Sequence, residues 1–303
     1  MDVLVTGAHG LIASALIPRL RADGHRVVRL VRSDPEGSDD VRWDPTAGTI
    51  DAAGLEGVDA VVHLAGAGIG DKKWTSARKQ LILDSRTRGT DLLARTLAGL
   101  SRPPNVLLSG SAVGYYGDRG AEAITETSAP GDDFPARVCV AWEAATAPAE
   151  EAGIRVVHLR TGIVLAAHGG ALQRMLLPFK LGLGGRIGSG DQYMSWIALD
   201  DHVGAMRHLL SAESVRGAAN LTAPNPATNV EFTKALGEAV HRPTALPTPL
   251  FPLKAVYGAE LVEHLLVKGQ RVLPRVLEQS GYEFAHPQLD NAMRAVLAAP
   301  AAA

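Results

Sequence analysis

The sequence predicts an α/β protein built on a doubly wound parallel sheet. Its first residues, 3–13, combine a short apolar run, a glycine-rich turn and the start of a helical pattern. Similar apolar runs recur along the chain, at residues 26–32, 60–65, 106–108 and 154–159. Helical patterns lie between them, at residues 10–23, 76–100 and 135–151. Strands that alternate with helices are typical of a parallel sheet covered on both faces.

The predicted organisation is one large domain followed by a smaller one. Residues 1–225 are expected to form a Rossmann-like dinucleotide-binding domain, and residues 226–303 a small, mostly helical C-terminal region that contacts substrate. Residues 166–200 contain many glycines and few clear strands, and we expect them to contribute to the substrate pocket.

Composition excludes several classes of partner. The formal net charge is −2, so neither nucleic acid nor an anionic membrane is expected as a partner. Cys139 is the only cysteine, which rules out an intrachain disulfide and fits a cytoplasmic protein. No apolar run approaches the length that spans a membrane. No cluster of His, Cys, Asp and Glu has metal-ligand spacing, so no metal is expected.

The turn after the first strand has the residues of a nucleotide site. Gly7 permits a tight turn, and Gly10 lets the backbone approach a pyrophosphate. The helix that starts at Leu11 and Ile12 then offers free N–H groups and the positive end of its dipole. The alternative is a glycine-rich turn of an α/β domain that binds nothing.

The end of the second strand indicates which dinucleotide binds. An NAD site usually has Asp or Glu there, to hold the ribose 2′-hydroxyl. This chain has Val31, Arg32 and Ser33 instead. A planar guanidinium and a hydroxyl suit a 2′-phosphate, which favours NADP. The alternative is that Arg32 is a solvated charge and Asp34 takes the ribose.

Several stretches resemble a known family, namely Val5-Thr6-Gly7-Ala8-His9-Gly10, Leu64-Ala65-Gly66, Ser85-Arg86, Ser111-Ala112-Val113-Gly114-Tyr115-Tyr116-Gly117, Trp142-Glu143 and Met194-Ser195-Trp196-Ile197. The chain resembles atypical extended short-chain dehydrogenases/reductases, and among them an epimerase-family subgroup with cell-division-inhibitor-like and human 39U-like members. Residues 269–274 and 281–284 resemble the C-terminal domain of unknown function of that subgroup.

The resemblance implies a Rossmann-like fold, NADP(H) and a set of cofactor-binding residues. Leu64, Ala65 and Gly66 match a strand end beside the cofactor, and the turn at Val164 matches one that passes the nicotinamide. Arg86 stands where extended relatives often have asparagine and could reach a cofactor phosphate. An arginine on the helix surface is an equally good interpretation of Arg86.

Catalysis in the wider family normally requires Ser, Tyr and Lys, and only the serine is in place. Ser111 follows the central strand, but the positions for tyrosine and lysine fall near Pro135 and Cys139. Tyr115 and Tyr116 lie in the loop beyond Ser111 and could supply a phenol, with Tyr116 the better candidate for the proton donor. The alternatives are that both tyrosines pack the loop and that Cys139 is a core residue.

Two further polar stretches have competing interpretations. Residues 186–196 are glycine-rich and polar, then aromatic, and we expect them to line the substrate pocket rather than form a simple surface loop. Asp200 and Asp201 open the next helical stretch, where carboxylates suit the helix dipole, so we expect them to be caps rather than catalysts.

Two functions remain open at this point. The first is an NADP(H)-binding oxidoreductase or epimerase that acts on a small hydroxyl or carbonyl compound. The second is a nucleotide-binding protein with little or no catalysis that reports cofactor state to a partner. The absent Tyr and Lys favour the second, whereas Ser111 and the two tyrosines favour the first. The substrate, the hydride face and the oligomeric state do not follow from the sequence.

Overall fold

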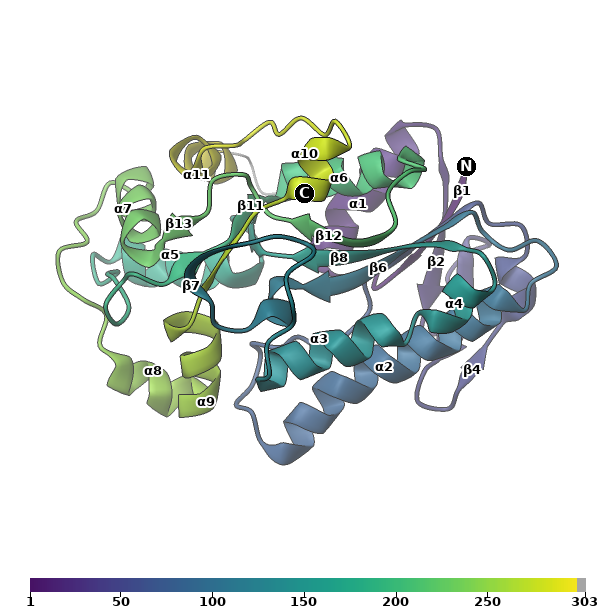
Figure 1. Cartoon of the computed structure of the whole chain (residues 1–303), viewed down its shortest axis with the longest axis horizontal. Coiled ribbons are helices and arrows are strands. Elements are labelled where there is room, and N and C mark those ends of the chain that lie inside the picture. The colour runs from purple at the N-terminus through teal and green to yellow at the C-terminus, as the bar shows by residue number, and fades with distance from the viewer. Residues whose placement is uncertain (299–303) are drawn as a thin grey trace.

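A parallel sheet forms the centre of the molecule (Figure 1). The computed structural model describes residues 1–298, and residues 299–303 lie outside that part. In spatial order the strands of the sheet are β12 (Gly217–Leu221), β8 (Arg155–Thr161), β6 (Val106–Ala112), β5 (Ala60–His63), β1 (Asp2–Thr6), β2 (Arg26–Val31), β3 (Asp40–Asp44) and β4 (Thr49–Ile50). Neighbouring strands run parallel, except that β4 pairs antiparallel with β3. The predicted fold class is confirmed.

Strand order reverses between β1 and β5. From β1 the chain moves outward to β2 and β3, then crosses back so that β5 pairs on the other side of β1, with Thr6 opposite His63. In doubly wound sheets, ligands bind outside the carboxyl ends of the strands at such a reversal. The glycine turn after β1 and the 64–66 segment after β5 therefore start at this point.

Helices cover both faces of the sheet, as Figure 1 shows. One face carries α1 (Leu11–Ala22) and α6 (Leu199–Ser211), and the other carries α2 (Ser76–Ala98), α3 (Phe134–Ala144) and α4 (Ala147–Glu151). Side chains of β1 alternate between the two cores, since Val3 and Val5 join the first and Leu4 joins the second. Burial on both faces explains why the strand sequences read as continuous apolar runs.

The remaining elements lie in the connections and at the C-terminal end, and their bounds are η1 (Ala52–Leu55), η2 (Val113–Tyr116), β7 (Gly120–Ile124), β9 (Ile163–Leu165), α5 (Gly170–Lys180), β10 (Tyr193–Met194), β11 (Trp196–Ala198), β13 (Ala227–Thr228), α7 (Asn229–Ala239), α8 (Leu250–Tyr257), α9 (Ala259–Val262), the π-helical turn η3 (Glu263–Val267), β14 (Gln270–Val272), α10 (Arg275–Gln279) and α11 (Leu289–Ala298). Among residues 1–298, no helix is both long and apolar enough to cross a membrane.

The C-terminal segment returns to the large domain and shares its core. Strand β14 pairs in parallel with β7, and Leu277 of α10 is fully buried in the same cluster as the inner faces of α1 and α6. The predicted boundary near residue 225 stays a prediction, because residues on both sides of it contribute to one core.

Asp201 has a different role from the one its sequence position suggested. Helix α6 begins after Ala198 with no side-chain cap. The Asp201 carboxylate is buried and instead accepts hydrogen bonds from the backbone N–H groups of Ala285 (2.7 Å) and His286 (2.9 Å). The prediction that this residue is a helix cap was wrong, because the returning C-terminal segment presents unpaired amides to it.

Candidate functional site

The turn after β1 has the geometry that a pyrophosphate site requires. Gly7 has a φ of +68°, a conformation that favours glycine. The Gly10 N–H donates to the Gly7 carbonyl at 2.8 Å and closes the turn. No side chain caps the start of α1, and His9 and Gly10 are exposed. The first N–H groups of a 12-residue helix, among them those of Leu11 and Ile12, are thus directed outward without a side-chain acceptor.

The end of β5 lies directly against this turn. A Cβ atom on Gly7 would lie 3.0 Å from the Leu64 carbonyl carbon, so only glycine fits. Thr6 Oγ1 accepts hydrogen bonds from the N–H groups of Leu64 (3.0 Å) and Ala65 (3.1 Å), which fixes the chain before the exposed Gly66. The structure therefore brings together Gly7, Gly10 and residues 64–66, as the sequence predicted.

Thr6 and the segment after β5 are held by a buried histidine. His63 contacts Thr6 Oγ1 at 2.8 Å and Thr90 Oγ1 at 3.0 Å through its two ring nitrogens. Complete burial lowers the pKa of His63 to about 4, so the ring is neutral at pH 7. Its role is structural.

The end of β2 presents the predicted polar pair to solvent. Val31 is buried, whereas Arg32 and Ser33 are exposed immediately after it. Asp34, the alternative ribose ligand, forms an exposed ion pair with Arg42 at 2.6 Å. Arg32 forms no ion pair with any residue in the described part of the chain, so its guanidinium is available to an incoming anion.

Arg86 lies at the end of β5 and not on the free surface of α2. Its Nη1 donates to the carbonyl oxygens of Ala67 (2.9 Å) and Ile82 (3.1 Å), and its guanidinium lies 4.8 Å from the Trp142 ring centre. Burial lowers the pKa of Arg86, but it remains a cation at neutral pH. No carboxylate within residues 1–298 pairs with it, so a half-buried positive charge faces Gly66.

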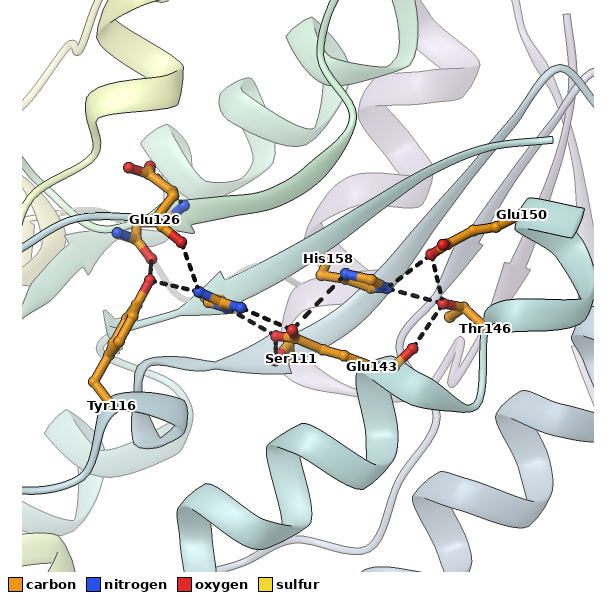
Figure 2. A network of polar contacts seen from close by, with 9 residues as sticks. Ser111, Tyr116, Glu126, Glu143, Thr146, Glu150 and His158 are labelled. Atoms are coloured by element: carbon orange, nitrogen blue, oxygen red, sulfur yellow. Dashed lines mark hydrogen bonds and ion pairs between the residues drawn. The ribbon is translucent and has the colours of Figure 1, made fainter. Parts of the chain in front are cut away.

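Ser111, at the end of β6, is held by a buried ion pair that Figure 2 shows. Its Oγ donates to Glu143 Oε1 at 2.6 Å. Arg160 donates to both oxygens of the same carboxylate, from Nε and Nη2, each at 2.8 Å. Burial opposes ionisation of Glu143, but the hydrogen bonds and charge of Arg160 outweigh it and lower the pKa of Glu143.

Tyr116 is a buried member of this network, and its hydrogen bonds stabilise the fold. It is fully buried, its hydroxyl donates to Asn220 Oδ1 at 2.6 Å, and it accepts from Arg160 Nη1 at 2.9 Å. Burial raises the pKa of Tyr116 to about 12. The preference for Tyr116 as proton donor does not agree with this geometry, because its hydroxyl proton already has a protein acceptor and its ring has no access to solvent.

Tyr115 and Cys139 are the two other candidate side chains that the sequence placed near Ser111. The Tyr115 ring lies against the Arg160 guanidinium, with 3.4 Å between the guanidinium carbon and the ring centre, and is only half-buried. Cys139 is buried, and burial raises the pKa of its thiol to about 12, so it is not a nucleophile at neutral pH. Val164, in β9, is half-buried and packs against the same core cluster as Leu11 and Ile12 at the start of α1.

The network continues from Glu143 toward the surface in the other direction (Figure 2). His158 Nδ1 lies 3.9 Å from Glu143 Oε2, and His158 Nε2 lies 2.9 Å from Thr146 Oγ1 and 3.6 Å from Glu150 Oε1. Burial lowers the pKa of His158, although both glutamates act against this shift. The Glu150 side chain is half exposed, so the polar chain extends from Ser111 to solvent.

Sequence reasoning missed Glu143 and Arg160 as members of the site. One signal was present: Glu143 directly follows the apolar residues 138–142 in α3, and Arg160 lies in the buried strand β8. A charge in such a position requires a partner. Spacing alone does not say that the partner of each is the other, because they lie 17 positions apart in the sequence.

Residues 186–196 pack against the C-terminal segment. Ser195 Oγ donates to the Gln270 carbonyl (2.7 Å) and accepts from the Val272 N–H (2.9 Å), and Gln192 donates to the Leu266 carbonyl (2.9 Å). Their role in a substrate pocket stays a prediction. Among residues 1–298 no group of three or more His, Cys, Asp and Glu side chains is arranged to hold a metal ion.

Comparison with known proteins gives two family matches. The NAD dependent epimerase/dehydratase family matches residues 3–221, and a domain of unknown function, DUF1731, matches residues 248–296. An epimerase family protein of Mycobacterium bovis is 44% identical over 291 residues, covering 96% of each chain. The human epimerase family protein SDR39U1 is 37% identical, covering 98% of this chain and 100% of the relative.

Solved structures agree with these matches. The crystal structure of human epimerase family protein SDR39U1 with NADPH superimposes with a TM-score of 0.89 at 38% identity, covering 98% of this chain and 99% of that one. A nucleoside-diphosphate sugar epimerase from Corynebacterium glutamicum gives a TM-score of 0.80 at 35% identity, covering 97% of this chain and 57% of that one.

Proposed function

Because the chain belongs to the NAD dependent epimerase/dehydratase family, we propose that it is an NADP(H)-dependent oxidoreductase or epimerase acting on a small hydroxyl or carbonyl compound. The observation that carries the proposal is the uncapped glycine turn at Gly7 and Gly10 beside the end of β5, with the unpaired Arg32 at the end of the neighbouring strand. The bound NADPH of the human relative supports the same cofactor.

The residues present fit an NADP molecule. Gly7, Gly10 and the N–H groups of Leu11 and Ile12 would receive the pyrophosphate at the start of α1, where no side chain caps the helix. Glycine is required at position 7, because a Cβ atom there would meet the Leu64 backbone. Val31, Arg32 and Ser33 would receive the adenosine ribose and its 2′-phosphate. Residues 64–66, Arg86 and Val164 would line the nicotinamide half. The cofactor, when bound, supplies or accepts a hydride at its nicotinamide ring.

The chain itself would bind and orient the substrate. Ser111 lies at the end of β6, adjacent to β5, and is the polar side chain best placed to hold a substrate oxygen. In this proposal residues 1–225 carry the cofactor, and residues 226–303 with the 166–200 segment complete the substrate region. We expect the protein to work in the cytoplasm with a small-molecule substrate.

A second function is favoured by one specific observation. Pro135 and Cys139 occupy the expected positions of the catalytic tyrosine and lysine, and Tyr116 is buried. A protein that binds NADP(H) without turnover, and reports the cofactor state to a partner, would have no need of those groups.

One experiment separates the two functions. Purified protein is titrated with NADPH and NADH by calorimetry, then incubated with NADPH and a panel of carbonyl compounds, with NADP⁺ and the matching alcohols, and with nucleoside diphosphate sugars. Turnover of any compound supports the enzyme. Tight NADPH binding with no turnover across the panel supports the second function, and absence of NADPH binding contradicts both.

A further inference from the structure

The hydroxyl proton of Ser111 already has an acceptor inside the protein. A serine hydroxyl has one donor and two acceptor lone pairs. The 2.6 Å hydrogen bond to Glu143 Oε1 uses that donor, and the carboxylate is held in its ionised form by Arg160. Ser111 can therefore present only lone pairs to a ligand at the end of β6. A carbonyl oxygen, which is itself an acceptor, has nothing to receive from it.

This geometry points to the part of the substrate that Ser111 recognises. Resting on the function proposed above, we propose that Ser111 accepts the proton of a substrate hydroxyl and relays its own proton to Glu143, from which the proton leaves through His158 toward Glu150. The substrate form that binds at Ser111 is then an alcohol.

The reaction balances with NADP⁺ as the co-reactant. The substrate O–H bond breaks and its proton goes to Ser111 Oγ, while the Ser111 proton goes to Glu143. The C–H bond of the same carbon breaks, and its two electrons leave as hydride to the oxidised cofactor. The products are a carbonyl compound, the reduced cofactor and protonated Glu143. Carbonyl reduction follows the same steps in reverse.

The route out of the site is visible in Figure 2. His158 Nδ1 faces Glu143 Oε2 across 3.9 Å, so the ring receives the proton from Glu143 once that gap shortens. Burial lowers the pKa of His158, which favours passing the proton on rather than keeping it. On its other side the ring meets Thr146 and the half-exposed Glu150. The charged groups that act on His158 are Glu143, Glu150 and Arg160, from α3, α4 and its own strand.

Other nearby groups are less suitable. The Tyr116 hydroxyl is engaged by Asn220 and Arg160, and the Cys139 thiol is buried with a raised pKa. Glu143 is thus the group within hydrogen-bond reach of Ser111 that can take up a proton. It acts on the substrate only through the serine, so it is a positioning and relay residue.

The first test needs no substrate. Histidines are labelled with ¹³C, and His158, identified by the signal lost in His158→Gln, is titrated by NMR. Glu143→Gln and Glu150→Gln should each lower its pKa, because each removes a negative charge that favours the protonated ring. Glu151→Gln, next to Glu150 and outside the network, is the control. A His158 titration that neither variant changes would overturn the relay.

The second test uses the substrate found with the panel described above. Ser111→Ala should lower kcat by about 10²–10⁴-fold in both directions. Ser109→Ala, two residues earlier on the same strand and without a hydrogen-bond partner for its hydroxyl, should leave kcat unchanged. Glu150→Gln should slow turnover by about tenfold and increase the solvent deuterium isotope effect. Full turnover in Ser111→Ala would overturn the proposal.

Binding measurements test the acceptor role separately from turnover. In dead-end complexes, with NADPH and alcohol or with NADP⁺ and carbonyl compound, the wild type should bind the alcohol more tightly, and Ser111→Ala should remove that preference. Ser111→Ala leaves the Glu143–Arg160 pair intact, so it folds even if Glu143→Gln does not. Equal affinities in the wild type would contradict the acceptor role. Failure of NADPH itself to bind would instead contradict the proposed function.

Discussion

The guanidinium of Arg86 stacks on Trp142, with 4.8 Å between its central carbon and the ring centre. Trp142 is itself fixed, because its Nε1 donates to Thr90 Oγ1 at 3.0 Å and its ring packs on Gly110, where a Cβ would lie 2.8 Å away. An arginine on α2 is thereby held beside the end of β5. Because no carboxylate of residues 1–298 pairs with Arg86, and because cofactors of this fold bind at this edge of the sheet, we propose that its guanidinium receives an anionic or polar group of the ligand.

Arg86→Ala should weaken NADPH binding by about tenfold to a hundredfold, as expected when a charge-assisted contact of about 1.5–3 kcal/mol is lost. Arg86→Lys should recover part of the loss, since lysine keeps the charge but not the planar stack. Calorimetric titration measures both. Arg88→Ala, on the exposed side of the same helix, serves as control. An unchanged NADPH affinity in Arg86→Ala would mean that Arg86 has only a structural role.

Arg32 should decide between the two nicotinamide cofactors. It has no ion-pair partner among residues 1–298 and follows the buried Val31. Its replacement by alanine should therefore remove most of the preference for NADPH over NADH, about 1.5–3 kcal/mol. The measurement is the pair of dissociation constants in wild type and variant. Arg21→Ala, an exposed arginine on α1, is the matched control. Equal affinities for the two cofactors in the wild type would contradict the assignment.

Gly10→Val should abolish NADPH binding and leave the fold in place. The φ of Gly10 is −76°, which any residue adopts, and a Cβ there would lie 3.1 Å from the Gly7 carbonyl oxygen, so the turn has to shift only slightly. The branched side chain would occupy the space that a pyrophosphate needs above the start of α1. Circular dichroism and calorimetry measure the two outcomes. The control is Gly37→Val, in an exposed loop with no atom within 4 Å of the new Cβ. Unchanged affinity in Gly10→Val would mean that the turn is only structural.

Tyr116→Phe should reduce stability more than activity. The variant leaves Asn220 Oδ1 without its buried donor and removes one of the two acceptors of Arg160 Nη1, which keeps the Glu126 carbonyl. We expect this to cost about 1–3 kcal/mol in the free energy of unfolding. Tyr115→Phe should cost less, because the half-buried Tyr115 contacts Arg160 through its ring. Urea denaturation gives both values. A loss of kcat of a hundredfold or more with unchanged stability would restore Tyr116 as the proton donor.

Acid should destabilise the fold through two buried histidines. Burial lowers the pKa of His63 to about 4 and that of His202 to about 3, against about 6.5 in the unfolded chain. The unfolded state takes up protons first, so this stability is complete above pH 6.5 and is lost as the pH falls toward 4. Each histidine contributes a slope of up to about 1.4 kcal/mol per pH unit.

The histidine effect is measured by urea denaturation at pH 7, 6 and 5. His63→Gln, whose amide can still meet Thr6 and Thr90, should show a shallower loss of stability on acidification. His168→Gln, at an exposed position, should behave as the wild type. A free energy of unfolding that stays constant from pH 7 to pH 5 would contradict a neutral His63.

The sequence by itself determined the fold class and the position of the glycine turn that we propose as the pyrophosphate site. Those features are local: an apolar run, a glycine that must adopt a positive φ, and a helix start lie within residues 3–13, and the same pattern of strand and helix repeats along the chain. The exposed positions of Arg32 and Ser33 could also be predicted, because both residues directly follow one apolar strand. A short stretch of sequence is enough to predict these features, because each strand, turn and helix forms from residues that are neighbours in the chain.

Only the tertiary structure decided which residues form hydrogen bonds and ion pairs with the polar residues at the end of β6. Glu143 comes from α3, Arg160 from β8 and Asn220 from β12, and their meeting around Ser111 and Tyr116 depends on strand order. The same holds for Asp201, whose partners Ala285 and His286 return from the far end of the chain. A charged residue among apolar ones predicts that it will have a partner in the folded protein. The identity of that partner depends on the fold, because residues far apart in the sequence leave no local pattern that links them.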